Sequence, residues 1–197
     1  MTDEEVVSAL KRVYVDGVRD WDDNYDAFIA DVQRRIGCFS VELARRSKVS
    51  VGTRAPVGDV MYYSLEVPIE APADRFMLTA EDVTAQGGEA YYLVAYCSTI
   101  LPVAEIRWHA VTLGTDGTRV RASHDLFDPD WLASHRGQES FALDVVAAAE
   151  HCGWQIIGPT LTEREAPKSW PWPFPTYDYQ DGEYLIRDYL IKGMREY

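Results

Sequence analysis

Two runs of alternating apolar and polar residues flank the dipeptide Asp116-Gly117, and this arrangement restricts the fold more than any other local feature. The first run covers residues 106–114 and the second covers residues 118–125. Asp-Gly favours a type I′ turn, because both central positions of that turn require positive φ. The pattern therefore predicts a β-hairpin with a two-residue loop, in which His109 on the first strand faces His124 on the second.

The two facing histidines are the first candidate site. Opposed Cβ atoms in a hairpin lie about 5 Å apart, so the imidazoles would be able to hold one metal ion or act as an acid–base pair. A metal site usually needs three or four protein ligands, and no HExxH, HxxEH or CxxC pattern supplies the others. Val111, Leu113 and Ala122 share the predicted face. We therefore favour the interpretation that both histidines lie at the edge of the core.

Helical periodicity is clearest in the N-terminal part of the chain. Thr2 followed by Glu5 forms a capping-box pattern, and apolar residues continue from there at helical spacing. A second helix is expected to begin near Asp20. Gly37 either ends this helix or lies within it, because residues 39–43 suit both a short strand and a continued helix.

The rest of the chain alternates predicted strands with predicted helices. Besides the hairpin, strands are expected at residues 59–67, 91–97, 154–157 and 184–191, and helices at 78–86 and 138–152, with an exposed loop at 126–137. No repeat or linker divides the sequence. We predict one α+β domain over residues 1–197, helical at 1–48 and sheet-rich at 57–197. The N-terminal helices and one later helix would pack on a largely antiparallel sheet.

Three cysteines, Cys38, Cys97 and Cys152, are scattered along the chain. An odd and widely spaced set predicts buried, reduced thiols rather than a disulfide framework. The sequence shows neither a basic, apolar leader nor a stretch of about 20 apolar residues that would span a membrane. We therefore expect a cytoplasmic location and no membrane partner.

The formal net charge is −13, from 19 Lys+Arg and 32 Asp+Glu. Nucleic-acid binding depends largely on cationic side chains, so this charge argues against a nucleic-acid partner and favours a basic protein partner. The alternative is that the acidity only keeps the protein soluble. The predicted partner-binding surface consists of Asp20, Trp21, Asp22, Asp23 and Asp26, with Asp128, Asp130 and Trp131 as a second patch.

Residues 170–175 read WPWPFP, the most unusual stretch of the sequence. Proline at every second position enforces an extended backbone. This strap is expected to pack its aromatic rings over the core, with an exposed anchor for a partner as the alternative.

The C-terminal third resembles a known family. A helix ending in AAAEHCG at residues 147–153, the strand WQII at 154–157 and the final YLIRDYL at 184–190 are similar to the ends of some bacterial immunity proteins encoded beside polymorphic toxins. The resemblance covers roughly residues 140–192 and implies a catalytically inert protein that binds a cognate toxin domain and blocks its active site. It assigns no individual residue, because such proteins vary most where they bind.

An acidic binding protein, specifically an immunity protein, is thus the predicted function. No catalytic residue, cofactor or metal ligand is assigned, since no nucleophile elbow, phosphate loop or dinucleotide motif is present in the sequence. The alternative is a small-molecule or metal-dependent enzyme with its site around His109 and His124. The oligomeric state is left open.

Overall fold

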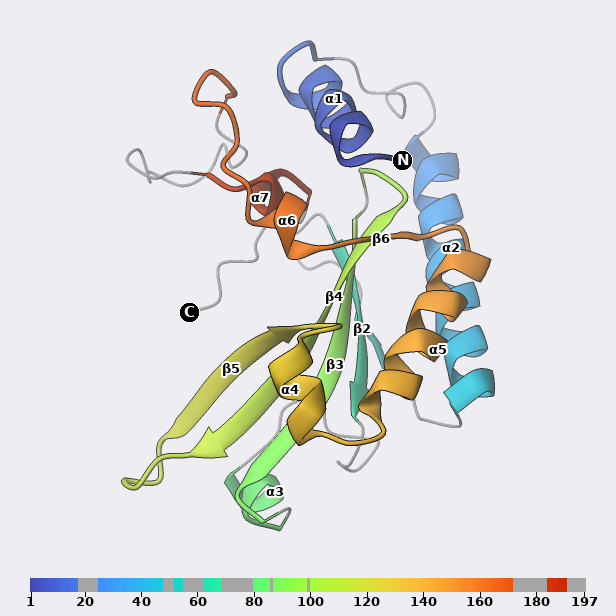
Figure 1. The fold of residues 1–197 in the computed structure, drawn as a ribbon. Coiled ribbons are helices and arrows are strands. Elements are labelled where there is room, and N and C mark those ends of the chain that lie inside the picture. The colour runs from blue at the N-terminus through green and yellow to red at the C-terminus, as the bar shows by residue number, and fades with distance from the viewer. Residues whose placement is uncertain are drawn as a thin grey trace.

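The computed structural model describes residues 1–17, 25–47, 52–54, 62–68, 80–85, 87–98, 100–171 and 184–190, and every structural statement below concerns these residues. They form an α+β fold in which helices pack on a mostly antiparallel sheet, as predicted (Figure 1). The strands are β1 (Gly52–Arg54), β2 (Tyr62–Pro68), β3 (Glu89–Ser98), β4 (Val103–Leu113), β5 (Arg119–Asp125) and β6 (Gln155–Ile157). The helices are α1 (Asp3–Tyr14), α2 (Tyr25–Ser47), α3 (Ala80–Ala85), α4 (Pro129–Ser134), α5 (Gln138–His151), α6 (Pro159–Thr162) and α7 (Ile186–Leu190).

The sheet has the strand order β1-β2-β3-β4-β5, with every neighbouring pair antiparallel. The short strand β6 is the exception, because it pairs with β4 in parallel. It uses the same edge of β4 as β5 does, but at the opposite end. Val103–Glu105 of β4 pairs with β6, whereas Arg107–Leu113 pairs with β5.

The predicted hairpin exists, but its register differs from the prediction by one residue. Gly114 and Thr118 close a three-residue loop, in which the N–H of Gly117 donates to the carbonyl of Gly114 and Gly117 has a φ of 78°. A tight turn followed by a left-handed glycine is the usual three-residue hairpin loop with a bulge, and it adds one residue to the predicted loop. As a consequence His109 pairs with Ser123, and His124 pairs with Trp108.

The capping box and the long second helix arise from local sequence. The side chain of Thr2 accepts a hydrogen bond from the N–H of Glu5 at 3.3 Å, and the Glu5 carboxylate accepts the N–H of Thr2. Helix α2 runs for 23 residues and passes through Gly37, which settles the question that the sequence left open. The apolar residues at positions 39 and 43 therefore belong to its buried stripe.

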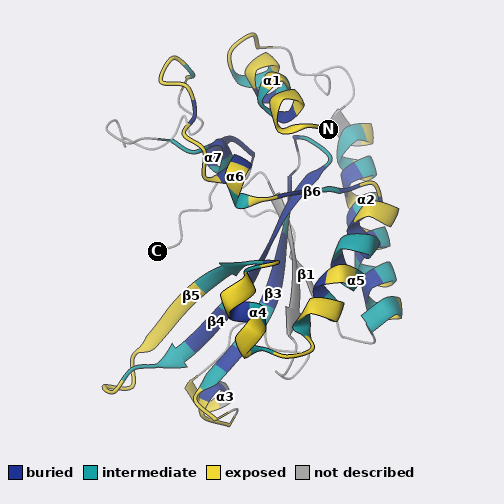
Figure 2. Cartoon of the chain, viewed as in Figure 1, coloured by how far each residue is buried: buried dark blue, intermediate teal, exposed yellow. Residues whose placement is uncertain are grey.

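One face of the sheet carries the larger core, against which α2 and α5 pack side by side (Figures 1 and 2). Trp108 lies at its centre and is fully buried. Cys38 of α2 and Cys152, just after α5, form a disulfide that joins the two helices, with a Cα–Cα distance of 5.7 Å. The prediction of three reduced thiols is therefore wrong for this pair. Residues 114 positions apart meet because both helices cover the same face, and only Cys97 is a free, buried thiol.

A second core lies where α1, α6 and α7 meet the end of the sheet. The rings of Tyr14 and Tyr189 contact edge to face at 5.0 Å, and the Tyr14 hydroxyl donates to the carbonyl of Tyr189. The strand predicted at residues 184–191 is instead a single bridge between Glu165 and Leu185 followed by α7. Its apolar residues pack at helical spacing, with Ile186, Tyr189 and Leu190 almost fully buried.

Only the first two residues of the predicted aromatic strap lie in the described part of the chain. The Trp170 ring contacts the Tyr189 ring edge to face at 5.1 Å, and the Tyr189 hydroxyl donates to the carbonyl of Pro171. Trp170 thus packs on the second core, and residues 172–175 lie outside the described residues. No helix in the described ranges is both long and apolar enough to cross a membrane.

Candidate functional site

The two histidines that the sequence predicted to face one another lie on opposite faces of the sheet. Side chains alternate along a strand, so a shift of one residue in register moves a side chain to the other face. His124 joins Trp108 on the face of the larger core, whereas His109 lies on the other face beside Ser123. Within the described ranges, no three His, Cys, Asp or Glu side chains are grouped closely enough to hold a metal ion.

His109 is held as a neutral imidazole by its surroundings. Its ring stacks on Tyr92 with centroids 5.3 Å apart, and its Nε2 lies 2.9 Å from the Tyr96 hydroxyl. Burial is the main cause that lowers the pKa of His109 to about 4, and the nearby guanidinium groups of Arg107 and Arg121 contribute to the same shift. The ring is therefore uncharged at neutral pH and belongs to the packing of this face.

The second predicted patch is placed only partly at the surface. Asp128 caps α4, because its Oδ1 accepts the N–H groups of Asp130 and Trp131 at 3.0 and 3.1 Å. Asp130 is exposed. Trp131 is only 4% exposed, and it stacks between Trp108 and His135 with centroid distances of 4.3 and 4.1 Å. The expectation that Trp131 forms part of a contact surface is therefore corrected: it is a core residue.

The sequence did contain a signal that a helix begins just before Trp131. Asp128 followed by Pro129 is the preferred pair at a helix start, with aspartate at the N-cap and proline in the first turn. The segment 126–137 was predicted as an exposed loop, yet it contains a helix whose first turn carries Trp131 back into the core. The other predicted patch cannot be assessed in the same way. Residues 20–23 lie outside the described part, and nothing is described of the Asp26 side chain in α2.

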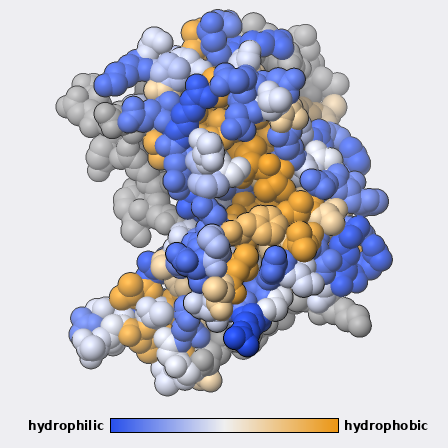
Figure 3. Space-filling view, in the orientation of Figure 1, coloured by the Kyte–Doolittle hydropathy of each residue, from blue (hydrophilic) through white to orange (hydrophobic). Residues whose placement is uncertain are grey.

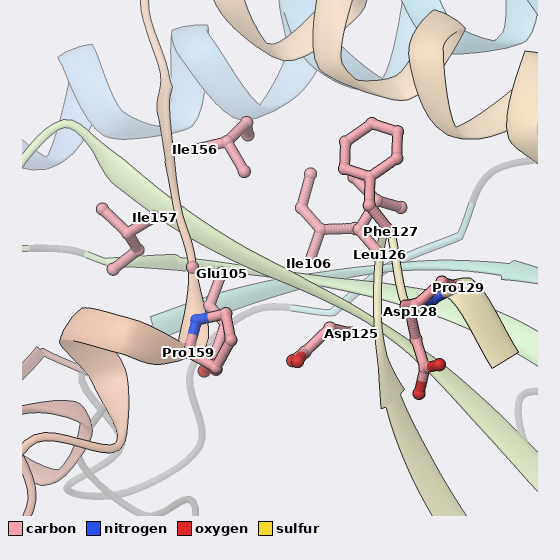
Figure 4. A pocket seen from close by; sticks show the side chains of 11 residues that line it. Glu105, Ile106, Asp125, Leu126, Phe127, Asp128, Pro129, Ile156, Ile157 and Pro159 are labelled. Atoms are coloured by element: carbon pink, nitrogen blue, oxygen red, sulfur yellow. The ribbon is translucent and has the colours of Figure 1, made fainter. Parts of the chain in front are cut away.

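A pocket of about 310 Å³ lies at the sheet edge between the ends of β5 and β6 (Figure 4). The chain leaves β5 at Asp125 and leaves β6 at Ile157, and the two strands meet β4 on either side of Ile106. The gap between them is consequently open along β4. Its walls are largely apolar, and three carboxylates join them; the lining consists of Glu105, Ile106, Asp125, Leu126, Phe127, Asp128, Pro129, Ile156, Ile157, Gly158 and Pro159.

A buried ionic network supports one side of this pocket. Glu105 is 2% exposed, and Arg187 of α7 donates to both of its carboxylate oxygens, at 2.7 and 3.1 Å. Arg107 Nε and the Thr162 hydroxyl each donate to Glu105 Oε1 at 2.9 Å. Arg107 also reaches Glu163 at 2.8 Å. The network therefore connects α6 and α7 to β4.

Burial dominates the electrostatics of Glu105. Removal from water raises the pKa of its carboxyl group, while the Arg107 guanidinium and the Thr162 hydroxyl act in the opposite direction. Because its oxygens already accept four hydrogen bonds, Glu105 has little acceptor capacity left for a ligand.

The two other carboxylates of the pocket, Asp125 and Asp128, are more exposed to solvent than Glu105. The Asp125 side chain is 40% exposed, and its Oδ1 lies 3.7 Å from Arg107 Nη2, which is beyond hydrogen-bonding distance. Asp128 Oδ2 lies 3.3 Å from His124 Nδ1. The backbone N–H of Trp131 is the main cause that lowers the pKa of Asp128, so this carboxylate is ionised at neutral pH. The pocket thus presents fixed negative charge beside apolar walls.

Apolar side chains also gather on the surface around the pocket. Phe127 lines the pocket and is 47% exposed. Figure 3 shows hydrophobic side chains collected over β6 and α5, on the face that is turned to the viewer in Figure 1. An exposed apolar area of this kind, with charged groups at its rim, is typical of a surface that binds another molecule.

Sequence reasoning missed this site, although one of its elements left a trace. Glu105, Arg107 and His109 occupy alternate positions of a strand that is otherwise apolar, so all three share one face. Charged residues at buried positions need partners, and this pattern was a signal for an ion network. The pocket itself had no such signal, because β6 joins β4 from a distant part of the chain.

Comparison of the sequence with protein-family models, with curated proteins and with solved structures found no match.

Proposed function

We propose that this protein binds and neutralises a basic protein partner, in the manner of a bacterial immunity protein that blocks a cognate toxin. The observation that supports this proposal best is the pocket at the edge of β4, where apolar walls lie beside the carboxyl groups of Asp125 and Asp128. Apolar contact area supplies most of the free energy of protein association, and charge complementarity selects the partner.

The overall charge supports the same proposal. A net charge of −13 attracts a basic protein over long range and raises its association rate. The apolar side chains around Phe127 then slow dissociation by excluding water from the contact. The four arginines of α2 are partly offset on the same helix, because Asp31 pairs with Arg34 and Arg35 and Glu42 pairs with Arg45 and Arg46.

A metal or acid–base site shared by His109 and His124 is not proposed. The hairpin register places the two side chains on opposite faces of the sheet, and His109 is packed between tyrosines. One ion or one substrate cannot touch both imidazoles in this arrangement.

The compartment in which the protein acts is part of the proposal. The sequence favoured the cytoplasm, whereas the Cys38–Cys152 disulfide favours an oxidising compartment, because reducing systems keep most cytosolic thiols reduced. Alkylation of free thiols in denaturant, on protein isolated from its native host, followed by mass measurement, decides between them; the denaturant is needed because Cys97 is buried. One alkylated cysteine indicates that the bond exists in the cell, and three indicate that it does not.

The test of the proposed function is isolation of a partner and measurement of its binding. Full-length protein is used to capture proteins from the native host, and the affinity of a captured basic protein is then measured by calorimetry. Phe127→Ala should weaken binding by about fivefold or more, since exposed aromatic anchors contribute at least about 1 kcal/mol each. Val120→Ala is the matched control, because Val120 is similarly exposed at 52% but lies beside the hairpin turn, where it pairs with Thr112.

The association rate provides a second readout. It should fall steeply as the salt concentration rises, because salt screens long-range attraction. The proposal is wrong if the captured proteins are acidic, or if Phe127→Ala and Val120→Ala have the same effect on affinity.

A further inference from the structure

Resting on the proposed function, we infer that the pocket between β5 and β6 receives one lysine or arginine side chain of the partner. The inference concerns the chemistry of the occupant, namely a cationic group on an apolar stem. It depends on three properties of the pocket: its walls, its charge and its position in the sheet.

The walls fit the stem of such a side chain. Ile106, Leu126 and Ile156 face the cavity, and Phe127 stands at its edge (Figure 4). Lysine and arginine bury their methylene groups against apolar surface while the charged group contacts a polar site. The volume of about 310 Å³ accommodates one long side chain but not a folded segment.

The charge around the pocket favours a cation. Four carboxylates, Glu105, Asp125, Asp128 and Glu163, stand against the two guanidinium groups of Arg107 and Arg187, which leaves two negative charges in excess. Glu105 is already saturated by its arginines and Thr162. The excess therefore resides on the more open carboxylates, and an anion placed there would be repelled.

Asp125 is the carboxylate best placed to meet the cation. Its side chain points into the gap between the strand ends, toward the side of Glu105 (Figure 4). Its contact with Arg107 at 3.7 Å is too long for a hydrogen bond, so its oxygens retain acceptor capacity. Asp128 Oδ1 already accepts the two N–H groups at the start of α4. Asp128 therefore contributes negative charge to the pocket but does not offer both of its oxygens to a ligand.

The sheet topology explains why the site is open to a side chain from outside. Strands β5 and β6 share one edge of β4 but stop on either side of Ile106. Because no strand among the described residues covers that position, the cavity lies at the edge of the sheet. A partner surface lying on the apolar area around Phe127 would carry its basic side chain into the gap.

The experiment titrates the full-length, isotope-labelled protein with n-butylguanidinium and follows amide signals by NMR. We expect saturable shifts at Ile106, Leu126 and Ile157, the amides that surround the pocket. n-Butanol has the same butyl stem without the charge. It should bind at least tenfold more weakly, because a hydrogen bond between charged groups is stronger than one between neutral groups.

Charge variants test the assignment of Asp125. Asp125→Asn should weaken n-butylguanidinium binding about tenfold. Asp128→Asn should weaken it less, and asparagine preserves the helix cap. Asp130→Asn is the matched control, because it removes the same charge from the same segment but does not line the pocket, and it should change the affinity less than twofold.

Three results would overturn the inference: no saturable shifts at the pocket amides, equal binding of n-butanol, or equal effects of Asp125→Asn and Asp130→Asn. Amide spectra of the variants show directly whether each is folded, so loss of structure cannot be confused with loss of binding. Failure of this titration while a basic partner is captured overturns the inference and leaves the proposed function standing. Binding of the probe when no basic partner is captured leaves the cation site and overturns the proposed function.

Discussion

Reduction of the Cys38–Cys152 disulfide should destabilise the protein strongly, and this effect can be measured without any amino-acid substitution. The bond joins residues 114 positions apart, so it closes a long loop in the unfolded chain. Loop-closure entropy for that length gives a stabilisation of about 5 kcal/mol at 25 °C. With a urea m-value of about 2.5 kcal/mol/M, reduction should move the midpoint of unfolding down by about 2 M.

The assay is urea denaturation followed by tryptophan fluorescence, with and without a phosphine reductant. The double variant Cys38→Ser/Cys152→Ser is the control, because the reductant should leave its midpoint unchanged. A shift of less than about 0.5 M in the wild type, with the bond confirmed by mass measurement, would refute the reasoning. In that case the unfolded chain retains residual structure that already restricts it, or strain in the folded state offsets the gain.

Three further predictions concern single side chains. Glu105→Gln should destabilise the protein by about 3 kcal/mol or more in urea denaturation, because it leaves two guanidinium groups without their shared carboxylate, whereas Glu163→Gln at the 54%-exposed neighbour should cost less than about 1 kcal/mol. His109, with its pKa lowered to about 4, favours the folded state above the unfolded pKa of 6.5, and this contribution is lost as pH falls toward 4. Between pH 7.5 and pH 5 the wild type should therefore lose about 2 kcal/mol more stability than His109→Gln, and equal losses would contradict the neutral, buried imidazole. Trp131→Ala should lower the free energy of unfolding by about 3 to 5 kcal/mol, as expected for a buried aromatic residue, and a change below about 1 kcal/mol would restore it as a surface residue.

The fold class followed from the sequence because its signals are local. The continuous run of strand-forming residues at 91–97 and the helical spacing of residues 138–152 are each complete within one element, and both elements were placed correctly. The capping box at Thr2 and Glu5 is equally local.

The predictions were wrong where the structure depends on a single residue in a loop or on a contact between distant parts of the chain. Asp116-Gly117 predicts a hairpin, yet loop length sets its register, and the bulged glycine moved His109 away from His124. The cysteine pair was missed because sequence spacing does not report that two helices cover the same face. Residues 184–191 alternate like a strand, but α1 offers a helical partner that only tertiary packing reveals.

The candidate pocket was less predictable than the fold. It is formed by ends of elements, namely the last residues of β5 and β6 and the starts of α4 and α6. None of these four segments has a sequence pattern that would by itself indicate a pocket. Only the parallel pairing of Val103–Glu105 with Gln155–Ile157 brings them together, and a three-residue parallel strand leaves no distinctive pattern in a sequence.

The contact between α1 and α7 has a consequence for how the chain matures. Helix α1 is synthesised about 170 positions before residues 186–190, so Tyr14 can contact Tyr189 only after that interval. At typical bacterial and eukaryotic translation speeds this delay is roughly 10 to 30 s. During that interval Val6 and Leu10 have no second core to enter. Assembly of this end of the molecule therefore follows the synthesis of α7, and until then the apolar face of α1 is available to chaperones.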